Sequence, residues 1–172
     1  WANIQKGPIK ENAPRWGNRF YPATKVANEV LLDAYENYYD MECVRIRPSG
    51  VYGPGHYRGG SGGGIAMNDL VHACLGEGSI RLEARHVGPN DFVYAADVGR
   101  GIALACSAKN APGKSFNIAV GRNYGPQDFL QALQQLMPDR TVTLARGAGK
   151  VKGRPRVDVS AAQRILGYKP QY

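Results

Sequence analysis

Residues 21–54, YPATKVANEVLLDAYENYYDMECVRIRPSGVYGP, hold the pattern that decides the fold of this chain. Apolar residues recur every three or four positions from residue 21 to about residue 39, which predicts an amphipathic helix. Residues 43–47 then alternate as a strand does, and Pro48 ends the strand because proline cannot donate to a sheet ladder. A helix that leads into a strand in this way favours an α/β architecture.

Further helices and strands alternate on the carboxyl-terminal side and extend the same prediction. Asp97 is the expected N-cap of one helix, and Pro126 and Pro138 are the expected start and stop of another. Residues 1–20 and 48–64 are rich in glycine and proline and are predicted to be loops. The predicted helices cover residues 65–75, 97–108, 126–137 and 160–167, and the predicted strands cover residues 79–84 and 116–120.

Apolar residues make up 43% of the 172 residues, which is enough for a sizeable core. In the predicted helix 97–108, the stripe expected to face that core is Val98, Ile102 and Cys106. In the helix that begins at Pro126, the residues expected to face inward are Phe129, Leu130, Leu133, Leu136 and Met137.

The cellular setting predicted from the sequence is the cytoplasm. No run of eighteen apolar residues and no signal-peptide pattern occurs, so neither membrane insertion nor secretion has support in the sequence. Cys43, Cys74 and Cys106 are odd in number and lie among apolar residues, which predicts reduced core thiols rather than disulfides.

A net charge of +8 raises the question of an anionic partner. The densest basic stretch, residues 140–156, contains no acid, but it also lacks the interleaved aromatic residues of a nucleic-acid stacking platform. We therefore expect no nucleic-acid partner. Three explanations of the charge remain open: a solvated surface, charge balance with acidic residues outside this chain, and capture of an anionic ligand.

The residues best suited to chemistry are Tyr21 and Lys25, which the sequence places four positions apart at the start of the first helix. This spacing puts both side chains on one face. A phenol in water titrates near pH ~10, and an adjacent ammonium stabilises the phenolate, so such a pair can exchange a proton with a sugar hydroxyl. The spacing by itself is common, and it more often reflects a packed ring beside a solvated amine than a catalytic pair.

Five sequence pieces add context to this pair, in the order YPATK at 21–25, VRIRPSGVYGPG at 44–55, DFVYAADV at 91–98, FNIA at 116–119, and DVSAA with LGYKP at 158–162 and 166–170. Together they resemble the second half of the extended short-chain dehydrogenases/reductases, the NAD-dependent epimerase/dehydratase family. The resemblance spans nearly the whole chain.

This resemblance implies a Rossmann-type α/β fold, of which the chain supplies the carboxyl-terminal part. Residues 1–58 would be the distal end of the nucleotide-binding domain, including the helix with the YxxxK motif, and residues 59–172 the smaller substrate-binding region. No GxGxxG fingerprint follows a strand, so the choice between NAD and NADP is not encoded here, and the chain alone is expected to be inactive.

The resemblance also assigns roles to individual residues. Tyr21 would be the catalytic acid/base, and Lys25 would assist it and also bind the nicotinamide ribose. Pro48, Ser49 and Val51 would lie against the nicotinamide. The family's catalytic serine or threonine would precede Trp1.

The implied substrate is a nucleoside-diphosphate sugar, but two departures weaken that expectation: Asn90 and Ala161 stand where many members carry arginine and lysine. An arginine fork suits a diphosphate, although a surface charge is the commoner explanation of each arginine candidate. The candidate substrate-binding residues are His56, Arg81, Arg154 and Arg156.

The function that the resemblance implies is that of an NAD(P)-dependent sugar-nucleotide epimerase, dehydratase or reductase, with hydride transfer at a sugar carbon. Two other functions remain open from the sequence. One is an oxidoreductase of the same family that acts on a non-nucleotide sugar acid, lactone or alcohol, and the other is a non-catalytic binding remnant. The resemblance further implies a homodimer through the tyrosine-bearing helix. No metal site is expected, because the spacing of His56, His72 and His86 matches no metal-binding pattern.

Overall fold

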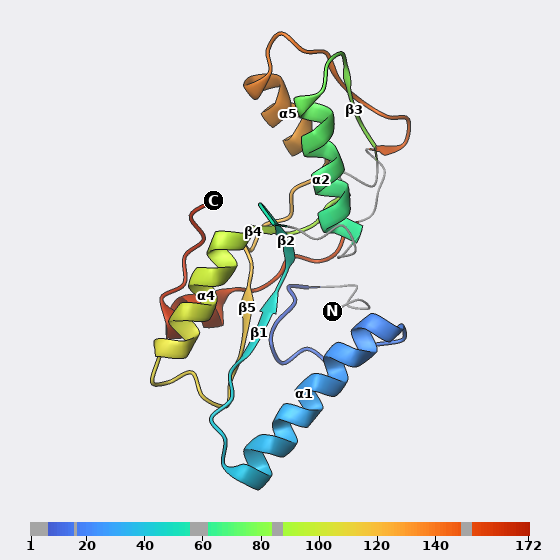
Figure 1. Cartoon of the computed structure of the whole chain (residues 1–172). Helices are drawn as coiled ribbons and strands as arrows, with labels where there is room; N and C mark the ends of the chain where they lie inside the picture. The colour runs from blue at the N-terminus through green and yellow to red at the C-terminus, as the bar shows by residue number, and fades with distance from the viewer. Residues whose placement is uncertain (1–6, 16, 56–61, 84–87, 149–152) are drawn as a thin grey trace.

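The computed structural model describes residues 7–15, 17–55, 62–83, 88–148 and 153–172 (Figure 1). The helices are α1 (Phe20–Tyr39), α2 (Gly62–Leu75), α4 (Ala95–Ser107), α5 (Pro126–Leu136) and the π-helix η2 (Ala162–Leu166). The strands are β1 (Arg45–Pro48), β2 (Gly50–Tyr52), β3 (Ile80–Leu82), β4 (Phe92–Tyr94), β5 (Ser115–Ile118) and β6 (Val142–Leu144). This alternation confirms the predicted α/β class and the helix that begins near Tyr21.

The described strands pair in three parallel ladders of two strands each. β1 pairs with β5, β2 with β4, and β3 with β6. In the first ladder Ile46 lies opposite Phe116, so the strand after α1 is joined to a strand far along the chain. Parallel pairing requires long crossovers, and the crossovers of this chain contain α2, α4 and α5.

Two apolar clusters hold these elements together. One joins α4, β5 and the carboxyl-terminal segment around Phe116 and Tyr168, both of which are fully buried. The other joins α2, α5, β3 and β6 around Leu82 and Leu133. Figure 1 shows the two groups at different ends of the molecule, with β2 and β4 between them.

β1 presents different side chains to its two sides, as the alternation of a strand requires. Val44 and Ile46 pack partly against the cluster of α4 and β5. Arg45 and Arg47 instead form ion pairs with acidic residues of α1. None of the 20 residues of α1 is buried, so charged contacts rather than a shared apolar core join this helix to the strand.

The prediction of a loop over residues 48–64 was wrong in part. Residues 50–52 form β2, and α2 already begins at Gly62. β2 exists because it pairs with β4, where Gly50 lies opposite Phe92. A prediction from the local sequence pattern cannot include a pairing partner so far along the chain. β6 was missed within the basic stretch 140–156 for the same reason, since its partner is β3.

The start and the inward face of α4 also differ from the prediction. The helix begins at Ala95, so Asp97 lies within its first turn and is not the N-cap. Asp97 is fully buried and accepts the backbone N–H groups of Gln171 and Tyr172. The buried face is Asp97, Gly101 and Ala105, while Ile102 and Cys106 are exposed.

Gly101 explains this rotation of α4. A Cβ atom at this position would lie 2.9 Å from Cδ1 of Ile118, so the absence of a side chain lets α4 approach β5 closely. Val98 packs against the apolar cluster as predicted, but the pattern placed the rest of the stripe, Ile102 and Cys106, one residue too far along because it gave glycine no weight. In α5 the pattern was correct for Phe129, Leu130, Leu133 and Met137, but Leu136 is exposed.

Arg140, which the sequence places in the basic stretch, has a specific structural contact. Its guanidinium donates to carbonyl oxygens within and just after the last turn of α2, at 2.8 Å to Cys74, 2.7 Å to Gly76 and 2.6 Å to Gly78. These bonds satisfy carbonyl groups that a helix end leaves without partners. They also tie α2 to the segment between α5 and β6.

The helix surfaces vary in polarity. α1 exposes several large apolar side chains, and α2 exposes Leu75. No helix within the described residues is both long and apolar enough to cross a membrane.

Candidate active site

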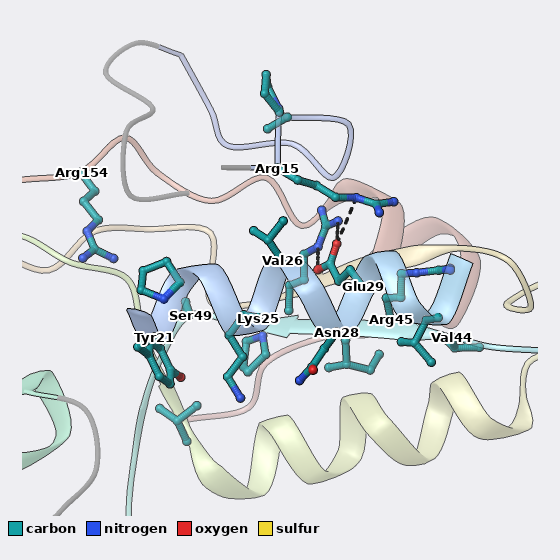
Figure 2. Close-up of a pocket in the computed structure, with 18 residues that line it drawn as sticks. Arg15, Tyr21, Lys25, Val26, Asn28, Glu29, Val44, Arg45, Ser49 and Arg154 are labelled. Carbon is teal, nitrogen blue, oxygen red and sulfur yellow. Dashed lines mark hydrogen bonds and ion pairs between the residues drawn. The ribbon is translucent and has the colours of Figure 1, made fainter. Parts of the chain in front are cut away.

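A groove of about 760 Å³ lies between the amino-terminal half of α1 and β1 (Figure 2). Helix α1 contributes Tyr21, Lys25 and Glu29, and the strand and the turn after it contribute Pro48 and Ser49. The groove therefore joins the two sequence pieces predicted to carry the chemistry.

Tyr21 and Lys25 lie together at the start of α1, as predicted. The Lys25 ammonium nitrogen is 5.3 Å from the centre of the Tyr21 ring, and Figure 2 shows both side chains on the same side of the helix. Tyr21 is 69% exposed, so its phenol is accessible from the groove. Lys25 has no ion-pair partner among the described residues, which leaves its three N–H donors for a ligand.

Pro48, Ser49 and Val51 line the same groove from the other side. The backbone N–H of Ser49 donates to Ile118, so the turn between β1 and β2 is anchored to β5. The Ser49 hydroxyl donates to a carboxylate oxygen of Asp91 at 3.1 Å. The turn thus presents a fixed surface opposite Tyr21 and Lys25.

Asp91 is a supporting residue that the sequence argument did not single out. It is 2% exposed and also accepts the backbone N–H groups of Val120 and Gly121, at 3.0 Å and 2.8 Å. Burial raises the pKa of the Asp91 carboxyl, although these N–H donors oppose the rise. The sequence did hold a signal for this role, since Asp91 is an acid directly before the apolar strand β4. An acid carried into a core by such a strand is stable there only with hydrogen-bond donors around it.

The candidate substrate-binding residues are only partly brought together. Arg154 lines the groove, and Figure 2 shows it beyond the Tyr21 end of α1. Arg81 is exposed on β3 and Arg156 is exposed near the carboxyl terminus, and neither is among the residues that line the groove. His56 lies outside the described residues.

Histidines contribute no metal site within the described part of the chain. His72 lies in the last turn of α2, and His86, like His56, falls outside that part. The described residues contain no group of three potential metal ligands.

A network of ion pairs borders the groove and was not foreseen. Glu29 of α1 accepts from Arg47 of β1 and also lies 3.3 Å from Arg15 of the loop before α1. Further along α1, Arg45 pairs with Asp33 and Glu36. The signal was present in the acids spaced by three and four along α1, but these residues also fit a solvated helix face.

The sequence and the structure were compared with those of known proteins. A family model described as "NAD dependent epimerase/dehydratase family" matches residues 3–119. A UDP-glucose 4-epimerase from Mycolicibacterium smegmatis is 29% identical over 166 residues, which cover 95% of this chain and 52% of that protein.

Solved structures give the same picture for the fold. UDP-glucuronic acid 4-epimerase from Bacillus cereus, in complex with UDP-glucuronic acid and NAD, matches with a TM-score of 0.76 and 22% identity over 98% of this chain and 53% of that one. DesIV, a dTDP-glucose 4,6-dehydratase from Streptomyces venezuelae with NAD and TYD bound, matches with a TM-score of 0.69 and 22% identity over 98% of this chain and 51% of that one. The chain therefore spans about half the length of these relatives, and their likeness confirms the predicted Rossmann-type α/β fold.

Proposed function

Because the chain belongs to the NAD-dependent epimerase/dehydratase family, we propose that it is the carboxyl-terminal part of an enzyme that transforms a nucleoside-diphosphate sugar with the help of a bound nicotinamide cofactor. The observation that carries this proposal is that one groove holds both the accessible Tyr21 phenol and the Lys25 ammonium, which has no ion-pair partner among the described residues.

In this proposal Tyr21 is the acid/base residue. A phenolate formed beside the Lys25 ammonium is stabilised by the positive charge, and it accepts a proton from a sugar hydroxyl that enters the groove. The cofactor supplies hydride transfer at the same sugar carbon. In the reverse direction the Tyr21 phenol returns the proton to the sugar oxygen.

The residues of the groove also fit the nicotinamide end of that cofactor. Lys25 has free N–H donors for ribose hydroxyls, and Pro48, Ser49 and Val51 offer a firm surface for the planar ring. We propose NAD or NADP as the cofactor, and the NAD complexes of the related structures support the former. The glycine fingerprint that binds the pyrophosphate is not part of this sequence, so the chain by itself is proposed to be inactive.

Arg154 is the proposed contact for the substrate diphosphate, because it alone of the candidate arginines lines the described groove. We propose residues 1–58 as the end of the nucleotide-binding domain and residues 59–172 as the substrate-binding region. The protein is further proposed to be cytoplasmic.

A homodimer is also part of the proposal, with α1 in the interface. Its support is the apolar surface of this helix, formed by Phe20, Val30, Leu31, Tyr35, Tyr38 and Tyr39. Light scattering of the full-length protein checks this, and a monomer at high concentration would contradict it.

The deciding experiment is Tyr21→Phe in the full-length protein that contains this chain. We expect kcat to fall by about 10²–10⁴-fold, the usual contribution of a positioned acid/base, without a change in the circular dichroism spectrum. Tyr172→Phe, at an exposed phenol outside α1 and outside the groove, is the matched control and should keep its activity. Retention of full activity by Tyr21→Phe would instead support a non-catalytic remnant.

Asn90 favours one alternative, an oxidoreductase of the same family with a non-nucleotide sugar acid, lactone or alcohol as substrate. Asn90 pairs through its backbone with Tyr124, and its amide group supplies no charge for a diphosphate. Competition by UDP and dTDP separates the two functions, because inhibition is expected only if the site recognises a nucleoside diphosphate.

A further inference from the structure

We infer that the ion pair between Glu29 and Arg47 positions the Tyr21 and Lys25 side chains against the turn at residues 48–51, a role that rests on the proposed function. Neither residue of the pair takes part in the proton transfer. Both are positioning residues, which act through the helix and the strand that carry them.

The geometry of the pair is that of a fork on a carboxylate. Arg47 donates through Nε to one oxygen of Glu29 at 2.7 Å and through Nη2 to the other at 2.6 Å. Its remaining nitrogen, Nη1, donates to the backbone carbonyl of Glu11 at 2.7 Å. Two parallel bonds fix orientation as well as distance, which a single point charge cannot do.

The pair is sheltered enough to constrain the groove. The side chains of Arg47 and Glu29 are 13% and 20% exposed, so water screens their attraction less than at an open surface. In contrast, the Arg15 and Asp33 side chains of the same network are 36% and 39% exposed.

The location of the pair links it to both sides of the groove. Glu29 lies one helical turn after Lys25, which itself lies one turn after Tyr21. Arg47 directly precedes Pro48, the last residue of β1, and Ser49 forms the turn that follows. Among the ion pairs described between α1 and β1, the fork is therefore the one nearest in sequence to both Lys25 and Pro48.

Within the described residues, the apolar side chains of α1 that line the groove, Val26 and Leu32, are only partly buried. α1 buries none of its own residues, so nothing of the kind that seats α4 on β5 holds its amino-terminal half in place. A displacement of about 1 Å in a reacting group can lower a rate by about 10²-fold, so loss of the fork should reduce turnover more than substrate binding.

The test uses Glu29→Gln in the full-length protein, with Glu36→Gln as the matched control. Glu36 also pairs with an arginine of β1, Arg45, but through a single guanidinium nitrogen rather than a fork. It lies two helical turns further along α1 than Glu29 and does not line the groove. We expect Glu29→Gln to lower kcat by about 10–100-fold with KM changed less than about threefold, and Glu36→Gln to change kcat less than about twofold. Equal losses of kcat in the two variants would overturn the inference, since the pair would then be only structural.

Arg47→Lys and Arg47→Gln separate the fork from the charge. Arg47→Lys keeps the positive charge but not the two-bond geometry. If orientation matters, its kcat should fall nearly as far as the kcat of Arg47→Gln. Combining Glu29→Gln with Arg47→Gln should cost little more than either change alone, because both remove one shared contact. Full rescue of kcat by lysine would overturn the role of the fork.

Amide hydrogen exchange of the α1 peptides gives a readout that does not depend on catalysis. Glu29→Gln should speed exchange in residues 20–28, whereas Glu36→Gln should speed exchange mainly in residues 33–39. Unchanged exchange in residues 20–28 would overturn the inference. If Tyr21→Phe kept its activity while this local effect appeared, the proposed function would fail and the link between helix and strand would stand.

Discussion

The two sides of β1 are held by different forces. Val44 and Ile46 join the apolar cluster of α4 and β5, where Phe116 and Ile118 are fully buried. On the other side, the ion pairs of Arg45 and Arg47 hold α1, which has no buried residue.

This difference indicates that the apolar side of β1 supplies most of the stability of the fold, and that the charged side determines the geometry of the groove. Burial of apolar surface stabilises strongly but tolerates small shifts, because it is not directional. Hydrogen-bonded ion pairs at partly exposed sites, such as the pair of Arg47 with Glu29, add little stability but define distance and angle. We therefore expect substitutions on the α4 side to change the free energy of unfolding, and substitutions on the α1 side to change activity.

The largest effect on stability should follow Phe116→Ala on the apolar side. Removing a fully buried ring should lower the free energy of unfolding by about 3–5 kcal/mol. Urea unfolding of the full-length protein followed by circular dichroism measures this. Leu136→Ala, at a side chain that is 76% exposed, is the control and should stay within about 0.5 kcal/mol.

Two glycines of α4 allow a direct test of how closely this helix packs on β5, because Gly101 faces Ile118 and Gly99 faces open space. Gly101→Ala should destabilise, because the added Cβ would lie 2.9 Å from Ile118. Gly99→Ala meets nothing within 4 Å and should stabilise the helix through higher helix propensity. Thermal unfolding should separate the two variants by about 1–3 kcal/mol, and equal midpoints would show that α4 does not rest tightly on β5.

Tyr168 tests the cost of a polar atom on the apolar side. Its hydroxyl is buried without a hydrogen-bond partner among the described residues, so Tyr168→Phe should stabilise by about 1 kcal/mol at neutral pH.

Burial raises the pKa of Tyr168 to about 12, so the folded state favours the neutral phenol. The stability that this preference contributes is complete below the unfolded pKa near ~10 and is lost as the pH rises through about 12. Alkaline melts of Tyr168→Phe should lack this loss. A wild-type loss that persists in the variant would assign it to another group.

The smallest expected effect on stability is on the α1 side. The hydrogen bond from Arg15 lowers the pKa of Asp33, so Asp33 contributes stability above its unfolded pKa near ~3.9, and this is lost as the pH falls through its lower folded pKa. Because Asp33 is 39% exposed, solvent screening keeps the contribution below about 1 kcal/mol. Acid melts of wild type and Asp33→Asn should converge at low pH, and a wide gap there would contradict this assignment.

The sequence predicted those parts of the fold that carry a local period. α1 begins one residue before Tyr21 and ends at Tyr39, because its repeat of three and four positions extends over 20 residues. β2 was out of reach, since three residues containing Gly50 become a strand only when β4 is present to pair with them. Asp97 was misplaced because a capping acid and a buried acid have the same local pattern, and only contact with Gln171 distinguishes them.

The candidate site also contains features that the local sequence predicts and features that depend on tertiary packing. The proximity of Tyr21 and Lys25 was predictable from helix geometry, and the contact of Lys25 with the Tyr21 ring confirms it. Their roles in catalysis remain predictions. The fork of Glu29 and Arg47 could not be predicted, because a pair that bridges a helix and a strand depends on the packing of both.

The bonds of Arg140 have a consequence for how the molecule opens. One guanidinium holds carbonyl groups at the end of α2 from the segment that connects α5 with β6, more than sixty residues later in the chain. Neither end can fray without releasing the other. We therefore expect α2, α5 and the β3–β6 ladder to exchange their amide protons as one cooperative unit, with a single opening free energy distinct from that of the α4 and β5 region.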